Sequence, residues 1–174
     1  MRKIIALLLA VMLVLIPAGS VLAATSDTVT ITMTGGLLSI TATSTPDPYD
    51  FGTVVQDATY ASALTAFTVE NDGTVEVDIT IHGANTTCAG TPWTLQANPG
   101  ADIYALDFSR DASPGWTEFT TADVDYMYDL PATGTDTDDF GLQLWTPVTI
   151  TDTTNLQTAV ITLTASQSLA VGPG

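Results

Sequence analysis

The sequence predicts an all-β protein, an antiparallel β-sandwich of about nine or ten strands. Three observations predict it: apolar and polar residues alternate with a period of two in many short runs, Gly, Pro, Asn and Asp cluster between the runs, and threonine is abundant. Alternation places apolar side chains on one face of a strand, and β-branched residues favour the pleated surface. Short strands joined by turns are typical of two stacked sheets, of immunoglobulin-like or jelly-roll-like type.

Residues 1–23 predict a secretory signal peptide. Arg2 and Lys3 precede an apolar run over residues 4–16, and Val21 and Ala23 suit cleavage after Ala23. An uncleaved N-terminal anchor is the alternative. We therefore expect a secreted, extracellular or cell-surface-associated protein whose residues 24–174 form a single β-sandwich domain, with no membrane span after signal cleavage.

The first predicted hairpin joins residues 29–33 to residues 38–42 through Gly35 and Gly36. Its first strand, residues 28–33, lies at the expected mature N-terminus, where it could add to the sheet edge of a neighbouring copy of the protein. Residues 51–55 predict a further short strand.

The clearest strand is predicted over residues 74–82, where four aliphatic side chains alternate with polar ones. Asn71, Asp72 and Gly73 precede it and predict a hairpin with residues 67–69. The same alternation predicts strands over residues 93–97, 103–108, 116–119, 140–144 and 159–165. Between residues 123 and 139 the alternation weakens, which predicts a long exposed excursion.

Charge excludes some partners. Beyond residue 23, Arg110 is the one basic residue against 19 acidic residues, so one positive and nineteen negative charges give −18 with His82 neutral. Such a surface repels phosphate backbones and anionic lipid, so we expect no nucleic-acid partner. Cations and basic polymers are the expected electrostatic partners, and solubility in salty media is the simpler explanation of the charge. Components of a cell envelope or extracellular matrix are the expected partners of a secreted protein of this kind. Cys88 is the one cysteine, so no intrachain disulfide can form.

The acidic stretch contains weak candidates for calcium ligands. Carboxylate oxygens are the ligands that calcium prefers, and the spacing does not fit an EF-hand loop. A solvated acidic loop is the alternative interpretation, and no other cofactor is expected. The six candidates are Asp123, Asp125, Asp129, Asp136, Asp138 and Asp139.

Other motifs are short. Asn85-Thr86-Thr87 is an N-glycosylation sequon that makes Asn85 a weak candidate acceptor. Residues 130–134 match the L-P-x-T-G sorting pentapeptide, but strand-like sequence follows, so we interpret them as a turn.

Catalysis has few candidates. His82 is the sole histidine, and the sequence ties no titratable partner to it, so we name no catalytic residue. Five large aromatic residues belong either to the core or to a sugar-stacking platform: Trp93, Trp116, Trp145, Tyr126 and Tyr128.

Residues 34–40, 50–54, 67–73, 93–95 and 157–164 together resemble WxL-type surface domains and related secreted immunoglobulin-like modules. The resemblance implies a non-catalytic protein that associates noncovalently with bacterial cell walls. Trp93-Thr94-Leu95 is one W-x-L motif, and the second tryptophan expected near the C-terminus is missing from residues 160–163.

We therefore predict a non-enzymatic secreted or cell-surface β-sandwich that acts as an envelope, matrix or adhesive component of a prokaryote. A calcium-assisted carbohydrate-binding module and a secreted hydrolase are the alternatives.

Overall fold

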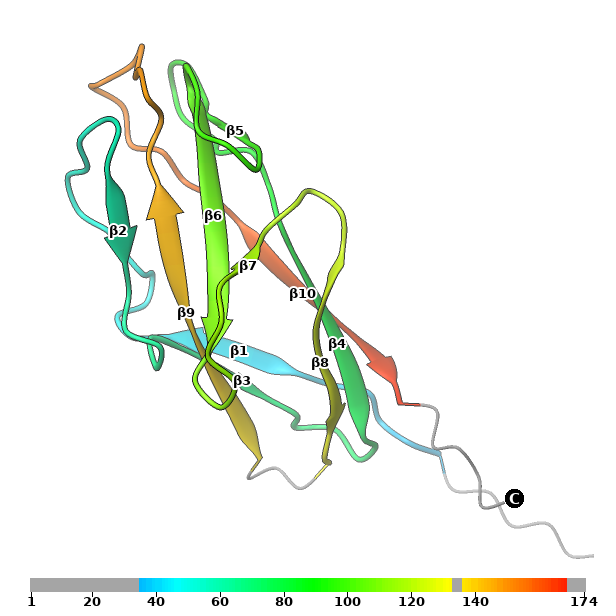
Figure 1. Ribbon diagram of the computed structural model, residues 1–174. Helices are drawn as coiled ribbons and strands as arrows, with labels where there is room; N and C mark the ends of the chain where they lie inside the picture. Colours follow the sequence, from blue (N-terminus) through cyan, green and yellow to red (C-terminus); the bar gives the residue numbers. More distant parts are fainter. Residues whose placement is uncertain (1–34, 133–135, 169–174) are drawn as a thin grey trace, which may run out of the picture. The chain divides into compact units, whose positions relative to one another are not determined.

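Ten β-strands form two sheets in the described part of the computed structural model (Figure 1). The structure describes residues 35–132 and 136–168. The predicted signal peptide, residues 1–23, and the predicted first strand, residues 28–33, lie outside the described residues. The described residues belong to one compact unit.

The larger sheet has seven strands in the order β1-β3-β9-β6-β5, with β2 also paired to β9 and β7 paired to β6. Its pairs are antiparallel apart from the parallel β5–β6 pair. The strands are β1 (Thr41–Ser44), β2 (Thr59–Ala61), β3 (Phe67–Glu70), β5 (Thr94–Leu95), β6 (Ile103–Arg110), β7 (Thr117–Glu118) and β9 (Thr137–Trp145).

The smaller sheet has three antiparallel strands in the order β10-β4-β8. These are β4 (Val77–Gly83), β8 (Val124–Leu130) and β10 (Ile161–Gln167). The two sheets pack face to face: the ring of Tyr126 on β8 lies 5.7 Å from that of Phe108 on β6 and 5.4 Å from that of Phe140 on β9, between centroids. The predicted all-β sandwich-like fold is thereby confirmed.

The core forms where alternate side chains of the two sheets meet. On β4, Val77, Ile79 and Ile81 are at most 1% exposed, and the polar residues between them face outward. The larger sheet contributes alternate side chains of β6 and β9, among them Leu106 and Leu142. Removing these apolar faces from water is the main driving force for the stacking of the sheets.

The predicted hairpin at residues 71–73 is wrong. β3 pairs with β1 and β9 in the larger sheet, whereas β4 pairs with β10 and β8 in the smaller one. Asn71 explains the difference, because its side chain is fully buried and its amide nitrogen donates to the carbonyl oxygens of Val75 and Leu130, at 2.9 Å each. Instead of turning the chain back on itself, Asn71 anchors a crossing from one sheet to the other.

The predicted exposed excursion over residues 123–139 is also wrong, since β8 and β9 occupy most of it. On β8 the buried positions, Tyr126 and Leu130, are four residues apart. Tyr128, midway between them, is exposed, so the alternation is broken. Two shifts in the β4–β8 register, and a positive φ of 58° at Asp129, mark the bulge that breaks it. The bulge therefore explains why the alternation weakens there.

The remaining predictions vary in outcome. The five strands predicted in residues 93–165 are present as β5, β6, β7, β9 and β10 with altered bounds. Residues 51–55 are not a strand, although Phe51 and Val54 pack against the core, and β2 was not predicted. Within the described ranges, no helix is long and apolar enough to cross a membrane.

Candidate functional site

Three polar side chains meet between the two sheets, and we call them the inter-sheet cluster: Arg110 on β6, Tyr126 on β8 and Asp138 on β9. The Nε and Nη2 atoms of Arg110 donate to the two carboxylate oxygens of Asp138, at 2.7 and 2.8 Å. The Tyr126 hydroxyl donates to Asp138 Oδ2 at 2.5 Å. The guanidinium carbon of Arg110 also lies 5.5 Å from the centroid of the Tyr126 ring. One carboxylate thus receives donors from both sheets.

Asp138 and Tyr126 are buried and Arg110 is half-buried, because all three occupy inward positions of their strands. Asp138 is 5% exposed and alternates on β9 with the core residues Phe140 and Leu142. A carboxylate in such a place is stable only when it is paired and hydrogen-bonded. Its hydrogen bond and charge raise the pKa of Arg110, while burial first, and then the bond to Asp138, raise the pKa of Tyr126. Arg110 therefore stays charged and Tyr126 stays neutral at neutral pH.

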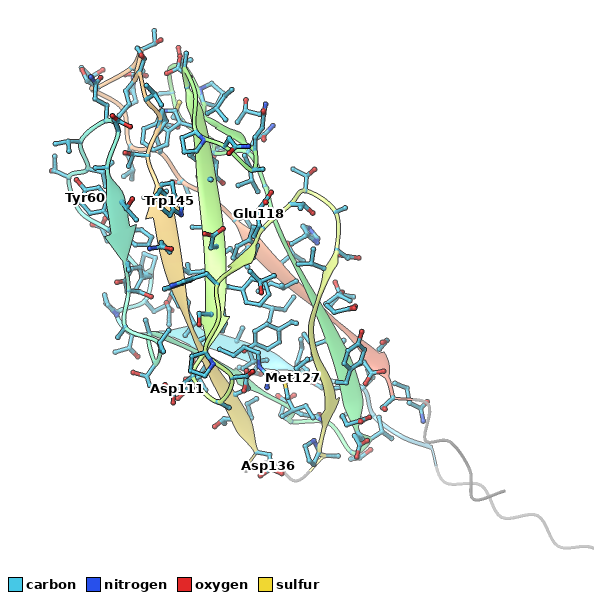
Figure 2. All side chains as sticks on the ribbon, viewed as in Figure 1. Tyr60, Asp111, Glu118, Met127, Asp136 and Trp145 are labelled. Atoms are coloured by element: carbon cyan, nitrogen blue, oxygen red, sulfur yellow. The ribbon has the colours of Figure 1, made fainter. Side chains whose placement is uncertain are left out.

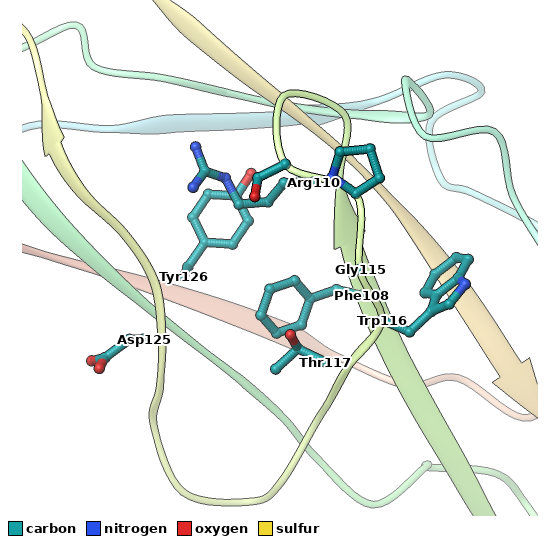
Figure 3. A pocket seen from close by; sticks show the side chains of 9 residues that line it. Phe108, Arg110, Gly115, Trp116, Thr117, Asp125 and Tyr126 are labelled. Atoms are coloured by element: carbon teal, nitrogen blue, oxygen red, sulfur yellow. The ribbon is translucent and has the colours of Figure 1, made fainter.

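A hollow of about 350 Å³ lies beside the cluster (Figure 3). Phe108, Arg110 and Tyr126 line it together with residues 113–117 and Asp125. Trp116, which is 45% exposed, stands at one side, and Asp125 at the other. The volume is at the lower end of the range for small-molecule sites, about 300–1,000 Å³. An indole, a carboxylate and hydroxyl groups are suited to a neutral, hydroxyl-bearing ligand.

The structure distributes the predicted calcium ligands over both sheets. Asp123 precedes β8, and its carboxylate lies 2.7 Å from Nδ1 of His82. Asp125 is exposed on β8, and its hydrogen bond raises the pKa of the Tyr128 phenol. Asp129, at the bulge, accepts a hydrogen bond from the hydroxyl of Ser168.

The other three predicted ligands belong to β9 or precede it. Asp136 lies at the end of the sandwich where β9 begins (Figure 2). Asp138 is part of the inter-sheet cluster, and Asp139 accepts a hydrogen bond of 2.6 Å from Thr68 Oγ1 on β3. In residues 35–132 and 136–168, no three His, Cys, Asp or Glu side chains form a group that could hold a metal ion. Calcium binding stays a prediction.

His82 has a titratable partner that the sequence did not reveal. The β4–β8 pairing places Ile81 opposite Val124, so the next residue on one strand and the preceding residue on the other, His82 and Asp123, become neighbours. Only the register could have identified this pair. Asn85 is exposed, and its Oδ1 accepts a hydrogen bond from the Leu95 amide at 3.0 Å. Its glycosylation stays a prediction.

The large aromatic residues do not share one face. Trp93 and Tyr126 belong to the core, as does Leu95 of the W-x-L motif. The backbone amide of Trp93 donates to Thr86 Oγ1 at 2.6 Å, which ties the motif to the segment that follows β4. Of the exposed rings, Tyr128 lies in the smaller sheet and Trp145 in the larger one.

Replacing Arg110 by methionine tests the role of the inter-sheet cluster in stability. We expect Arg110→Met to lower the free energy of unfolding by about 3–5 kcal/mol, because Asp138 is left as a buried charge without its partner. The added substitution Asp138→Asn removes the stranded charge and should recover part of the loss. Urea unfolding followed by tryptophan fluorescence measures both effects. An Arg110→Met protein within about 0.5 kcal/mol of the parent contradicts the assignment.

Alkaline pH should destabilise the fold through two tyrosines. Burial raises the pKa of Tyr104 to about 12, and the pKa of Tyr126 is raised as well, whereas tyrosine in an unfolded chain ionises near pH ~10. A raised folded pKa gives stability that is present below the unfolded pKa and is lost as pH rises above it. Residues 24–174 contain no lysine, so few other groups titrate in this range.

We therefore expect the free energy of unfolding of a Cys88→Ser protein to fall above about pH 10, by up to about 1.4 kcal/mol per pH unit for each of the two tyrosines. Urea titrations between pH 8 and pH 11.5 measure it. A free energy that stays constant through pH 11 contradicts the expectation.

Comparisons with protein-family models, with curated proteins and with solved structures found no match for this chain. The resemblance to WxL-type surface domains stays a prediction.

Proposed function

We propose that the chain is exported and acts as a non-catalytic component of a cell envelope, extracellular matrix or adhesive surface. The observation that supports this most strongly is that the polar groups beside the hollow bond to one another. Arg110 directs two donors to Asp138, and Tyr126 directs its hydroxyl to the same carboxylate. In an enzyme, charged and hydroxyl groups beside a pocket would contact the reacting substrate. Here the hydrogen bonds of these groups connect the two sheets instead.

The outer surface fits a protein that works in a salty or polymer-rich medium. Acidic residues even face each other across strands, as Asp107 and Glu118 do on β6 and β7. Adjacent like charges are tolerated only where water and counterions screen them. A surface of this kind stays soluble, repels nucleic acid and anionic lipid, and attracts cations or basic polymers.

Fractionation of the native host tests the proposed location and processing. With a C-terminal tag, we expect the protein in the envelope or extracellular fraction, with an N-terminus at Ala24, because residues 1–23 have the charge and hydropathy pattern of a signal peptide. N-terminal sequencing and immunoblotting of the fractions give the result. A full-length chain that stays in the cytosol contradicts the proposal.

Carbohydrate binding at the hollow is a second candidate function, favoured by one observation. The indole of Trp116 is 45% exposed at the rim of a hollow that Arg110 and Asp125 also line. An exposed indole offers a face on which a sugar ring can stack, and the polar groups can bond its hydroxyls.

A glycan array with the parent protein, with calcium or with a chelator, tests this second candidate. For any glycan that binds, we expect Trp116→Ala to weaken binding by about tenfold, the factor that corresponds to ~1.4 kcal/mol. Trp145→Ala is the matched control, because Trp145 is also a partly exposed tryptophan and does not line this hollow. Equal losses in both variants, or no bound glycan, would exclude the hollow as a sugar site.

A further inference from the structure

Strand β10 forms one edge of the smaller sheet, and its one neighbour among the described residues is β4. The amide of Ser168 donates to the carbonyl of Glu76, next to the paired residues Gln167 and Val77. In an antiparallel pair, backbone groups point alternately toward the partner strand and away from it. The even-numbered residues of β10 therefore bond to β4, and the odd-numbered ones direct their N–H and C=O groups to the free edge.

The same odd-numbered positions carry the apolar face of β10. Ile161, Leu163 and Ala165 pack against the core but are only half-buried. Ile81 and Ile79, which lie opposite Leu163 and Ala165 on the central strand β4, are at most 1% exposed. The core of the sandwich is thus less well covered along β10 than along β4.

Other edges of the two sheets have features that prevent pairing with another strand, and β10 lacks these features. On β8, the opposite edge of the smaller sheet, Asp125 and Asp129 are exposed and a bulge interrupts the strand. At the edge of the larger sheet, β1 has four residues, and Pro46 and Pro48 follow it. Charges, bulges, prolines and short strands are the usual means by which proteins prevent edge-to-edge pairing.

β10 has seven residues, and no charged residue occurs anywhere between Thr153 and Gly174. This matters in a chain whose residues 24–174 carry a net charge of −18, because two copies repel each other over most of their surfaces. They can approach most closely along a strand whose own side chains carry no charge. The charge distribution therefore favours contact between copies at β10.

We propose that β10 pairs with β10 of a second copy of this chain, in antiparallel orientation about a two-fold axis at Thr164. The two three-stranded sheets then become one six-stranded sheet. With this register, Leu163 lies opposite Ala165 of the partner subunit, so the apolar faces continue across the junction. The odd-numbered residues supply about eight backbone hydrogen bonds. The interface is isologous and closes as a dimer. This inference goes beyond the proposed function, because it names a partner and the strand that binds it.

Disulfide trapping tests the register. Thr164 of the two subunits would form a non-hydrogen-bonded pair with Cα atoms about 4.5 Å apart, within the range that a disulfide bridges. We expect Thr164→Cys in a Cys88→Ser background to form a covalent dimer under mild oxidation. Thr162→Cys in the same background is the matched control, because its two copies would be four residues out of register, about 14 Å apart. Cross-linking that is equal at both positions, or missing at residue 164, overturns the proposal.

Analytical ultracentrifugation of residues 24–174 gives an independent measurement. We expect a dimer that Thr164→Glu dissociates, with a dissociation constant at least about tenfold higher, because it places two like charges at the two-fold axis. Thr117→Glu adds the same charge at an exposed position on β7 and should leave the dimer intact. Circular dichroism shows whether each variant retains the β fold.

Deletion of residues 24–34 tests whether residues 28–33, of the same copy or of a second copy, pair with this edge instead of β10. We expect the dimer to survive the deletion. A parent protein that is a monomer and dimerises only after the deletion would show that its own residues 28–33 fill the edge. A parent dimer that the deletion abolishes would show that these residues are exchanged between copies. Either result overturns the proposal, as does a monomer in both cases. The outcome of the fractionation experiment is independent of all of these results.

Discussion

The buried carboxylate of Asp138 is the constraint on which the arrangement of the two sheets depends. It lies on an inward position of β9, where an apolar residue would otherwise contribute to the core, and it needs donors on every accessible side. Arg110 supplies two donors from the same sheet, and Tyr126 supplies one from the other sheet. Sheet stacking through apolar side chains is not directional, whereas these bonds require one relative position of β6, β8 and β9.

Asn71 has a comparable role at the crossing between the sheets. Its amide bonds to the backbone carbonyl of Val75, within the crossing, and to that of Leu130, at the end of β8 in the smaller sheet. The Asn71 carbonyl oxygen also accepts a hydrogen bond from the Gly73 amide at 3.0 Å. Buried polar groups that are fully bonded specify a single geometry. Polar side chains at two places therefore determine how apolar layers, which could slide, fit together.

Local pattern was enough to predict the fold class and most strands, because a period of two is a property of each strand alone. It failed where a single side chain changes the path of the chain. Asn71 occupies a sequence typical of a hairpin turn, and only its burial against β8 reveals a crossing. The bulge at Asp129 hides a strand, and the pairing of His82 with Asp123, or of Arg110 with Asp138, depends on register between distant segments. No single-sequence pattern contains that information.

The position of Arg110 has a consequence for the resistance of the folded protein to proteases. Proteases of the trypsin class cut after arginine or lysine, and beyond residue 23 the chain offers them one peptide bond, between Arg110 and Asp111. In the folded protein, the Arg110 side chain is held by Asp138, and the Asp111 amide donates to the carbonyl of Asp139 at 2.8 Å. A protease must bind the cleaved segment in an extended, accessible form. The fold therefore protects the one tryptic site beyond residue 23 with the same ion pair that belongs to the inter-sheet cluster.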